Sequence, residues 1–286
     1  MELKAQEKQE KSVTEPSVRV PARARHKRLS TGNAVALAEV WPQVIARIRE
    51  AKWRLLLLDF DGTLVAIRRR PQEVHLSQQG KKILRWLVRL ENFSIAIISG
   101  RELRTIKRLV GIKGLQYIGL HGAEQEGKTA AVSEAARCAL ESARKKAQEE
   151  LKRLRGIEIE NKGLSFAVHY RRASLQNAEL AGEAARKIVA SATDKLRILP
   201  GKMVWEVLPR QFPGKGSAAL ALFNALAGSK IAIYFGDDET DEEAFAVLPG
   251  QVTVNVGTGR NTRAAFYVRN HSEVMGFLRR LEKELR

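Results

Sequence analysis

The sequence predicts an α/β fold in which a doubly wound, mainly parallel sheet is interrupted by a smaller inserted α/β segment. From residue 53 onward, short apolar runs of strand length alternate with segments of helical periodicity, which favours a sheet with helices on both faces. These runs are apolar throughout, as buried parallel strands are. Between residues 126 and 210 the runs alternate between apolar and polar residues instead, which predicts a second, half-exposed sheet.

The elements of the main sheet can be placed in order. Residues 33–52 are interpreted as a helical lead-in that contains Pro42. The strands expected after it are LLLLDF, FSIAIIS, YIGLHG, IAIYFGD and VTVNV. A helix is predicted at 77–90 behind a Ser77 cap, and the last helix has one apolar stripe, formed by Val274, Leu278, Leu281 and Leu285. Residues 53–125 and 211–286 would make up this core domain.

Residues 126–210 are predicted to form an inserted α/β cap that acts as a lid. A charged helix at 133–154, the runs IEIE and LSFAVHYR, a helix near 176–190 and the run KMVWEVLP follow one another. Alternation separates the two faces of these runs. One face would carry Leu164, Phe166, Val168, Tyr170, Met203, Trp205 and Val207. The other would carry His169, Arg171, Lys202 and Glu206, and we expect this polar face to be turned away from the helices.

The N-terminal residues 1–32 are basic and poor in apolar residues, so we expect a disordered tail. Its cluster RVPARARHKR and the net charge of +18 leave open the binding of nucleic acid or another polyanion. No apolar run reaches the roughly 18 residues of a membrane span and no signal peptide is evident, so a cytoplasmic location is expected. The lone Cys138 excludes an intramolecular disulfide. The oligomeric state is not indicated.

Polar side chains gather where the predicted core strands end. Asp59 and Asp61 follow the first strand, Ser99 follows another, and Asp237 with Asp238 follows a third. Ligands of doubly wound sheets bind at these carboxyl ends. Several carboxylates near one point repel one another unless a cation holds them, and oxygen ligands favour Mg²⁺. The sequence therefore predicts a magnesium site.

Such a site suits phosphoryl transfer. One carboxylate can attack phosphorus, and a second, two residues away, can protonate the leaving alcohol and then activate water. A lysine would neutralise the transferring group, and Lys215 precedes a predicted helix upstream of Asp237. Further backbone amides and hydroxyls are available from Gly62, Thr63, Ser99 and Gly100.

DFDGTL, SGR, a lysine before a helix and GDDETD together resemble the four motifs of the haloacid dehalogenase-like (HAD) phosphohydrolases. The resemblance implies a HAD-like Rossmannoid core with Asp59 as the nucleophile and Asp61 as the general acid/base. It implies phosphate binding by Ser99, Gly100 and Lys215. It places the metal on Asp59, Asp61 through its carbonyl, and Asp237, with Asp241 and Asp238 orienting the site.

GLHGAE, FAVHYR and the pattern from Gly201 to Pro209 resemble, more narrowly, the trehalose-6-phosphate phosphatases. This resemblance implies Mg²⁺-dependent hydrolysis of trehalose 6-phosphate. The sugar would be held by His121, Glu124, Lys162, His169, Arg171, Lys202 and Glu206. One departure is Leu208, where that family often has an arginine; Arg210 is a candidate replacement.

Two alternatives remain open. The core motifs fit a phosphatase for another sugar or glycosyl phosphate equally well, such as sucrose 6-phosphate or mannosylphosphoglycerate. A protein of another class, which binds polyanions through its basic tail, would also carry the charge of this chain. The second alternative predicts a function that does not depend on Asp59.

Overall fold

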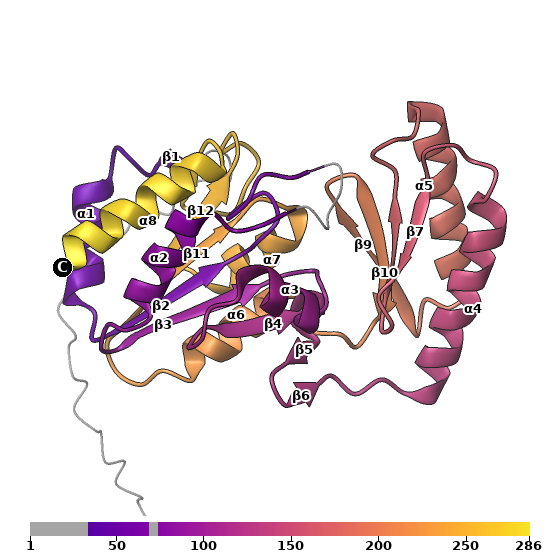
Figure 1. The fold of residues 1–286 in the computed structure, drawn as a ribbon. Helices are drawn as coiled ribbons and strands as arrows, with labels where there is room; N and C mark the ends of the chain where they lie inside the picture. The colour runs from indigo at the N-terminus through magenta and orange to yellow at the C-terminus, as the bar shows by residue number, and fades with distance from the viewer. Residues whose placement is uncertain (1–33, 69–73) are drawn as a thin grey trace, which may run out of the picture. The chain divides into compact units, whose positions relative to one another are not determined.

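The computed structural model describes residues 34–68 and 74–286. Within them, a mainly parallel nine-stranded sheet and a separate antiparallel sheet of four strands confirm the predicted fold class (Figure 1). The tail expected at residues 1–32 lies outside the described residues. None of the helices in the described part of the chain is long and apolar enough to cross a membrane.

The large sheet has the strand order β1-β13-β12-β11-β2-β3-β4-β5-β6. All of its pairings are parallel except those of β5 with its two neighbours. Its strands are β1 (Val35–Ala36), β2 (Trp53–Leu58), β3 (Phe93–Ile98), β4 (Gln116–Gly119), β5 (Glu124–Gln125), β6 (Lys128–Thr129), β11 (Lys230–Gly236), β12 (Val252–Val256) and β13 (Phe266–Val268). From β2, chain order runs outward through β3 to β6 on one side and through β11 to β13 on the other, so the winding reverses at β2.

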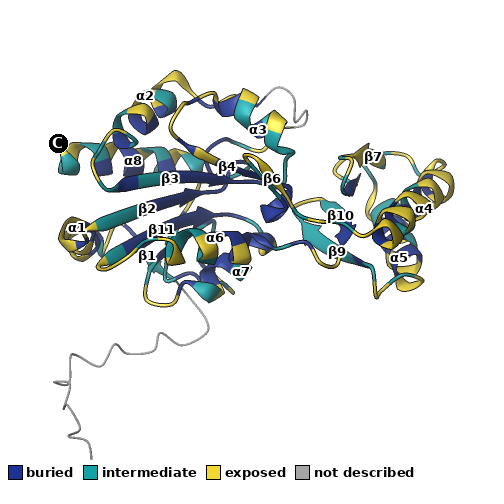
Figure 2. Ribbon diagram, turned by 90° about the horizontal axis from the view of Figure 1, so that it is seen from below, coloured by how far each residue is buried: buried dark blue, intermediate teal, exposed yellow. Residues whose placement is uncertain are grey.

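Strand β2 lies at the centre of the sheet, and its four leucines are buried on both faces (Figure 2). Leu56 and Leu58 pack with one hydrophobic cluster and Leu55 and Leu57 with another. Successive strand residues point to opposite faces. An uninterrupted apolar run is therefore what a strand covered on both sides requires, and it fixes where the residues after Leu58 lie.

Helices cover both faces of this sheet. The first cluster contains residues of α1 (Trp41–Glu50), α2 (Gln78–Leu87), α3 (Leu103–Val110) and α8 (His271–Leu285). The second contains residues of α6 (Lys215–Asn224) and α7 (Glu239–Val247). The Ser77 hydroxyl accepts a hydrogen bond from the Gly80 amide at 3.1 Å, so the predicted cap of α2 is confirmed.

The small sheet has the order β7-β8-β10-β9, all antiparallel, and packs on two helices. Its strands are β7 (Glu158–Asn161), β8 (Phe166–His169), β9 (Leu196–Gly201) and β10 (Val204–Pro209), and its helices are α4 (Glu134–Leu151) and α5 (Leu175–Ala190). Phe166, Val168, Trp205 and Val207 pack against the helices, as the alternation predicts. The opposite face carries Glu206.

Two predictions about this sheet are wrong. Met203 does not lie on the apolar face, because it occupies the turn between β9 and β10 with a φ of 64° and is 48% exposed. Leu164 precedes β8 and packs with Leu208 in a different apolar cluster. Strand β9 was not predicted either, since LRILPG contains an arginine, a proline and a glycine. Lys202 therefore lies in a tight turn, not on a strand.

Candidate active site

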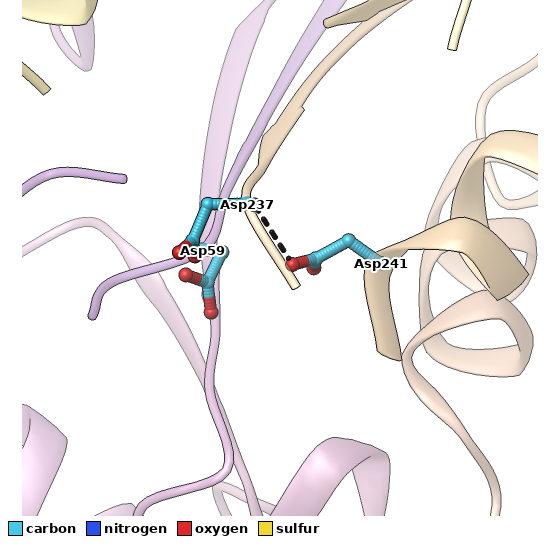
Figure 3. Close-up of side chains that lie close together, drawn as sticks. All are labelled: Asp59, Asp237 and Asp241. Atoms are coloured by element: carbon cyan, nitrogen blue, oxygen red, sulfur yellow. Dashed lines mark hydrogen bonds between the residues drawn. The ribbon is translucent and has the colours of Figure 1, made fainter. Parts of the chain in front are cut away.

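The predicted site residues of the core come together because their strands are neighbours. Asp59 directly follows β2, Ser99 follows β3 and Asp237 follows β11, and β2 is paired with both other strands. All three side chains are buried, the least so being Asp237 at 7% exposure. In Figure 3 the carboxylates of Asp59 and Asp237 lie side by side, and Asp241 reaches toward them from α7.

Lys215 is the buried cation of this group. It begins α6, is 3% exposed, and its Nζ donates to Asp59 Oδ1 at 2.6 Å and to Asp241 Oδ1 at 2.9 Å. Burial lowers the pKa of its ammonium, but Asp241 and Asp59 raise it by more, so the pKa is well above its ordinary value. The lysine is therefore a permanent charge that fixes the orientation of the Asp59 carboxylate.

Asp241 organises its neighbours with both of its oxygens. Oδ1 accepts from Lys215 and from the Tyr234 hydroxyl at 2.8 Å. Oδ2 accepts from the backbone amides of Asp237 and Asp238, each at 3.1 Å, and the first of these bonds is dashed in Figure 3. With four hydrogen bonds and no exposure, Asp241 holds the loop and the lysine in place.

The carboxylate oxygens of this group are close enough together to bind one cation. One oxygen from each of Asp59, Asp237 and Asp241 lies within 4.8 Å of the others. Each oxygen of Asp241 already accepts two hydrogen bonds, whereas each oxygen of Asp59 and Asp237 accepts at most one, so Asp59 and Asp237 are the side chains that can ligate. Gly62, with a φ of 91°, passes so close to Asp237 that a Cβ would overlap its carboxylate. The backbone of the DFDGT turn thus reaches the same point.

The electrostatics of this group also favour a cation. Burial raises the pKa of Asp59 well above its ordinary value, with Asp241 and Asp237 adding to the shift and Lys215 opposing it. Burial raises the pKa of Asp237 to about 6, although Lys202 opposes the rise. Carboxylates whose charge is penalised in this way gain most from a bound metal ion.

Asp61 lies apart from the three-carboxylate group. Its two oxygens accept hydrogen bonds from Arg101, Oδ2 from Nε at 2.6 Å and Oδ1 from Nη2 at 2.7 Å. The side chain of Asp61 is therefore not placed among the candidate metal ligands. Its expected contribution to the metal site through the carbonyl stays a prediction.

The predicted phosphate-binding residues border the same space. Ser99 is 1% exposed, and its Oγ accepts from the Arg101 amide at 3.2 Å. Thr63 Oγ1 donates to Asp237 Oδ1 at 3.4 Å. A Cβ at Gly100 would lie 2.6 Å from His121 Nε2, so only glycine allows the imidazole to pack there.

A second polar cluster centres on Glu206 of β10. Its Oε2 accepts from Lys162 Nζ at 2.9 Å and from His121 Nε2 at 3.1 Å, while Oε1 accepts from Ser165 Oγ at 2.7 Å. Lys162 also donates to the Gly100 carbonyl at 3.1 Å. This cluster joins the small sheet to the loops that follow β3 and β4.

The Glu206 carboxylate is kept ionised within this cluster. Burial raises its pKa, but Lys162 and then His121 lower it further, and the net pKa is far below the ordinary value. The Nε2 proton of His121 is directed at the carboxylate, and Nδ1 is buried with no partner among the described residues. His121 has a φ of 56°, between Leu120 and Gly122 that also have positive φ values.

The other predicted substrate-binding residues have separate partners. His169 Nε2 contacts Glu160 at 2.9 Å, Arg171 donates to the Lys202 carbonyl at 3.2 Å, and Glu124 accepts from the Leu103 amide at 2.7 Å. Lys202 Nζ donates to Asp237, and its amide to Asp238 at 3.3 Å. Lys202 therefore links the β9–β10 turn to the carboxylate group of the core.

Leu208 is 1% exposed and packs with Leu120, Ala123 and Phe212. In the antiparallel register its partner on β9 is Arg197. The Arg197 Nη2 donates to the Phe212 carbonyl at 3.1 Å, whereas Arg210 donates to the Thr193 carbonyl. The arginine beside Leu208 is thus Arg197, contributed by the strand that was not predicted.

Sequence reasoning missed three residues of these clusters: Arg101, Ser165 and Tyr234. Arg101 belongs to the SGR motif, where only the serine and glycine were considered. Ser165 alternates with Phe166 and so lies on the Glu206 side of the sheet, which the period-two pattern could have indicated. Tyr234 stands within a buried strand, where its hydroxyl requires a partner.

A family model described as trehalose-phosphatase matches residues 57–274 of this chain. A rice protein (Oryza sativa subsp. japonica) named "Probable trehalose-phosphate phosphatase 3" is 30% identical over 278 residues, which cover 86% of this chain and 74% of that protein. A trehalose-phosphate phosphatase of Mycobacterium tuberculosis is 33% identical over 251 residues, covering 82% of this chain and 63% of its own length.

Solved structures share the fold. The C-terminal domain of Candida albicans trehalose-6-phosphate phosphatase superposes with a TM-score of 0.77 at 24% identity, covering 87% of this chain and 99% of that one. Aspergillus fumigatus trehalose-6-phosphate phosphatase gives a TM-score of 0.62 at 25% identity, with the same two coverages. The agreement covers both sheets.

Proposed function

Because the chain belongs to the trehalose-phosphatase family, we propose that it is a Mg²⁺-dependent phosphatase that hydrolyses trehalose 6-phosphate to trehalose and phosphate. The observation that carries the proposal is the buried contact between Lys215 and Asp59, 156 positions apart. It joins a nucleophile candidate to a phosphate-binding candidate at the point where the winding of the sheet reverses.

Asp59 is the proposed nucleophile. One of its oxygens forms a bond to phosphorus as the bond from phosphorus to the sugar oxygen breaks, which leaves an aspartyl phosphate. The electron pair of the broken bond stays on the sugar oxygen, and protonated Asp61 supplies the proton that completes the alcohol. Lys215 holds Asp59 in the orientation for this attack.

Water completes the reaction. Asp61, now a carboxylate, accepts a proton from the water molecule, whose oxygen attacks phosphorus while the bond to Asp59 breaks. Phosphate leaves, Asp59 is free again, and Asp61 is again protonated. The two displacements thus return both residues to their starting states.

Asp59 and Asp237 are the side chains proposed to hold the cation, with the Asp61 carbonyl as a third ligand. When bound, Mg²⁺ neutralises charge on the phosphoryl oxygens. The remaining phosphoryl oxygens would be bound by Ser99, Gly100 and Lys215. The Ser99 hydroxyl already accepts a hydrogen bond from the Arg101 amide.

We assign sugar recognition to the residues of the Glu206 cluster together with Lys202, His169, Arg171 and Glu124. The support is that Lys162 Nζ donates both to the buried Glu206 and to the Gly100 carbonyl, next to the proposed phosphate site. A site built to hydrogen-bond hydroxyl groups rejects analogues that lack them.

The test is phosphate release from trehalose 6-phosphate, sucrose 6-phosphate, mannosylphosphoglycerate and glucose 6-phosphate, with Mg²⁺ or with a chelator. We expect preference for trehalose 6-phosphate, dependence on the metal, and loss of activity in Asp59→Asn. Asp194→Asn, which alters an exposed aspartate paired with Lys195, is the matched control. Preference for another substrate would reject the sugar assignment, and full activity in Asp59→Asn would reject the mechanism.

A further inference from the structure

We propose that Arg101 is a positioning residue that fixes the carboxylate of Asp61 in the orientation for proton transfer. The inference rests on the proposed function, in which Asp61 exchanges a proton with the leaving sugar oxygen and then with water. It adds a residue to the reaction that does not itself touch the substrate.

The contact between Arg101 and Asp61 is bidentate. Nε and Nη2 each donate to a different carboxylate oxygen, at 2.6 and 2.7 Å. Such a fork fixes the plane of a carboxylate as well as its position. Since each oxygen has a further lone-pair site, the pairing leaves Asp61 able to contact a substrate oxygen or water.

Arg101 is itself held on several sides. Its guanidinium lies over the Phe60 ring, 5.7 Å from the centroid. Its amide donates to Ser99 Oγ at 3.2 Å, and its carbonyl accepts from the Leu120 amide at 2.9 Å. Gly119 allows this approach, because a Cβ there would overlap the Leu103 amide nitrogen. The arginine can therefore transmit a fixed geometry.

Solvent exposure separates this pair from an ordinary surface ion pair. The Arg101 side chain is 15% exposed, whereas that of Asp61 is 37% exposed. Exposed pairs contribute little because solvent and side-chain mobility weaken them. Here the arginine is the less exposed partner and the aspartate is the more accessible one, as is required of a group that must meet substrate.

The pairing also explains how the two acids of DFDGT differ. Asp59 is held by Lys215 from α6, and Asp61 is held by Arg101 from the loop before α3. Each acid has its own cation on a different element. Removing Arg101 should therefore affect proton transfer and leave the nucleophile in place.

The experiment compares Arg101→Met and Arg101→Lys with Arg104→Met, which alters an exposed arginine in the first turn of the helix that follows, α3. We expect kcat on trehalose 6-phosphate to fall about 100-fold in Arg101→Met, with KM changed by less than about threefold. Arg101→Lys should recover only part of the loss, because lysine keeps the charge and lacks the fork. Arg104→Met should match the wild type.

A second measurement separates a defect in proton transfer from a general loss of active-site structure. Nitrophenolate leaves without needing a proton, so the first-turnover burst of nitrophenol from nitrophenyl phosphate should change by less than about threefold in Arg101→Met. An equal loss in the burst and in trehalose 6-phosphate hydrolysis would overturn the inference. An unchanged kcat on trehalose 6-phosphate would overturn it as well.

A double-mutant cycle with Asp61→Asn tests whether Arg101 acts through Asp61. We expect Arg101→Met to have no further effect in the Asp61→Asn protein, since the group that it positions is already lost. Additive losses would contradict the inference. If the wild-type protein shows the burst but does not hydrolyse trehalose 6-phosphate, the proposed substrate is wrong. The cycle would then be run on the alkyl phosphate that the protein does hydrolyse.

Discussion

Two buried carboxylates beside lysines, Glu206 and Asp237, have pKa values shifted in opposite directions. For Glu206, the pull of Lys162 and His121 exceeds the cost of burial, and the pKa falls far below its ordinary value. For Asp237, burial exceeds the pull of Lys202, and the pKa rises to about 6. The difference lies in the surrounding charges and not in the depth of burial.

The Glu206 cluster contains one carboxylate with a lysine, a histidine and a hydroxyl. The core group contains three carboxylates around Lys215, with Lys202 reaching only Asp237. In the first cluster, Lys162 balances the charge of the single carboxylate; in the second, two lysines face three carboxylates, which leaves that group short of positive charge. This difference supports the proposed roles, in which the first cluster recognises neutral hydroxyl groups and the second receives a cation and an anionic phosphoryl group.

Lys215→Met should have the largest effect, because it removes the buried cation of the charge-deficient group. We expect activity on trehalose 6-phosphate and on nitrophenyl phosphate to fall together, on the order of 10³-fold. Steady-state kinetics measure both. Lys145→Met, on an exposed face of α4, is the control. A loss confined to the sugar phosphate would contradict the division between the two clusters.

Glu206→Gln should have a smaller and selective effect. We expect kcat/KM for trehalose 6-phosphate to fall about 100-fold, because a neutral amide no longer neutralises Lys162 beside the sugar. Activity on nitrophenyl phosphate should stay within about threefold. Glu141→Gln, which alters an exposed glutamate of α4 paired with Arg144, is the matched control. Equal losses on the two substrates would count against sugar recognition by Glu206.

Magnesium affinity should depend on pH through Asp237. As pH falls through about 6, the proton competes with Mg²⁺ for the Asp237 carboxylate, and the affinity should drop about tenfold per pH unit. The folding stability of the metal-free protein should change with pH in the opposite direction. A raised native pKa favours the folded state at low pH, and this contribution is lost as pH rises through about 6. Calorimetric titration and thermal unfolding measure the two effects.

Lys202→Met should have the smallest effect, and it should strengthen Mg²⁺ binding, whereas the other two substitutions lower activity. Lys202 donates to Asp237 and so provides positive charge where the cation is proposed to bind. Removing it should tighten Mg²⁺ binding about threefold, even if substrate hydrolysis declines. Titration of metal into substrate-free protein tests this, with Lys195→Met as the control on an exposed site. Weaker metal binding in Lys202→Met would show that the lysine supports the ligand instead of competing for it.

The sequence predicts the core better than the small sheet, for physical reasons. Strands such as β2 and β11 are continuous apolar runs, so their ends and the acids that follow them can be located by pattern alone. Strand β9 contains Arg197, Pro200 and Gly201 and carries no such pattern. The turn at Lys202 and Met203 was consequently read as part of a strand. The link between Lys202 and Asp237 depends on how that turn meets the core.

The site also contains pairings that no local pattern encodes. Arg101 meets Asp61 across 40 positions, and Tyr234 meets Asp241 across the end of its own strand. His121 reaches Glu206 because three successive residues adopt positive φ values, two of them not glycine. Motif resemblance indicated which residues gather at the site, but only the packing of the loops determines which acid each cation holds.

The place of β2 between β3 and β11 has a consequence for how the chain folds. Its partner on one side follows soon in the sequence, whereas its partner on the other, Lys230–Gly236, is made only after the whole small sheet. Until then β2 is an apolar edge strand, with its amides and carbonyls free to pair with other chains. On a ribosome, correct folding of this protein should therefore depend on protection of that edge until β11 emerges.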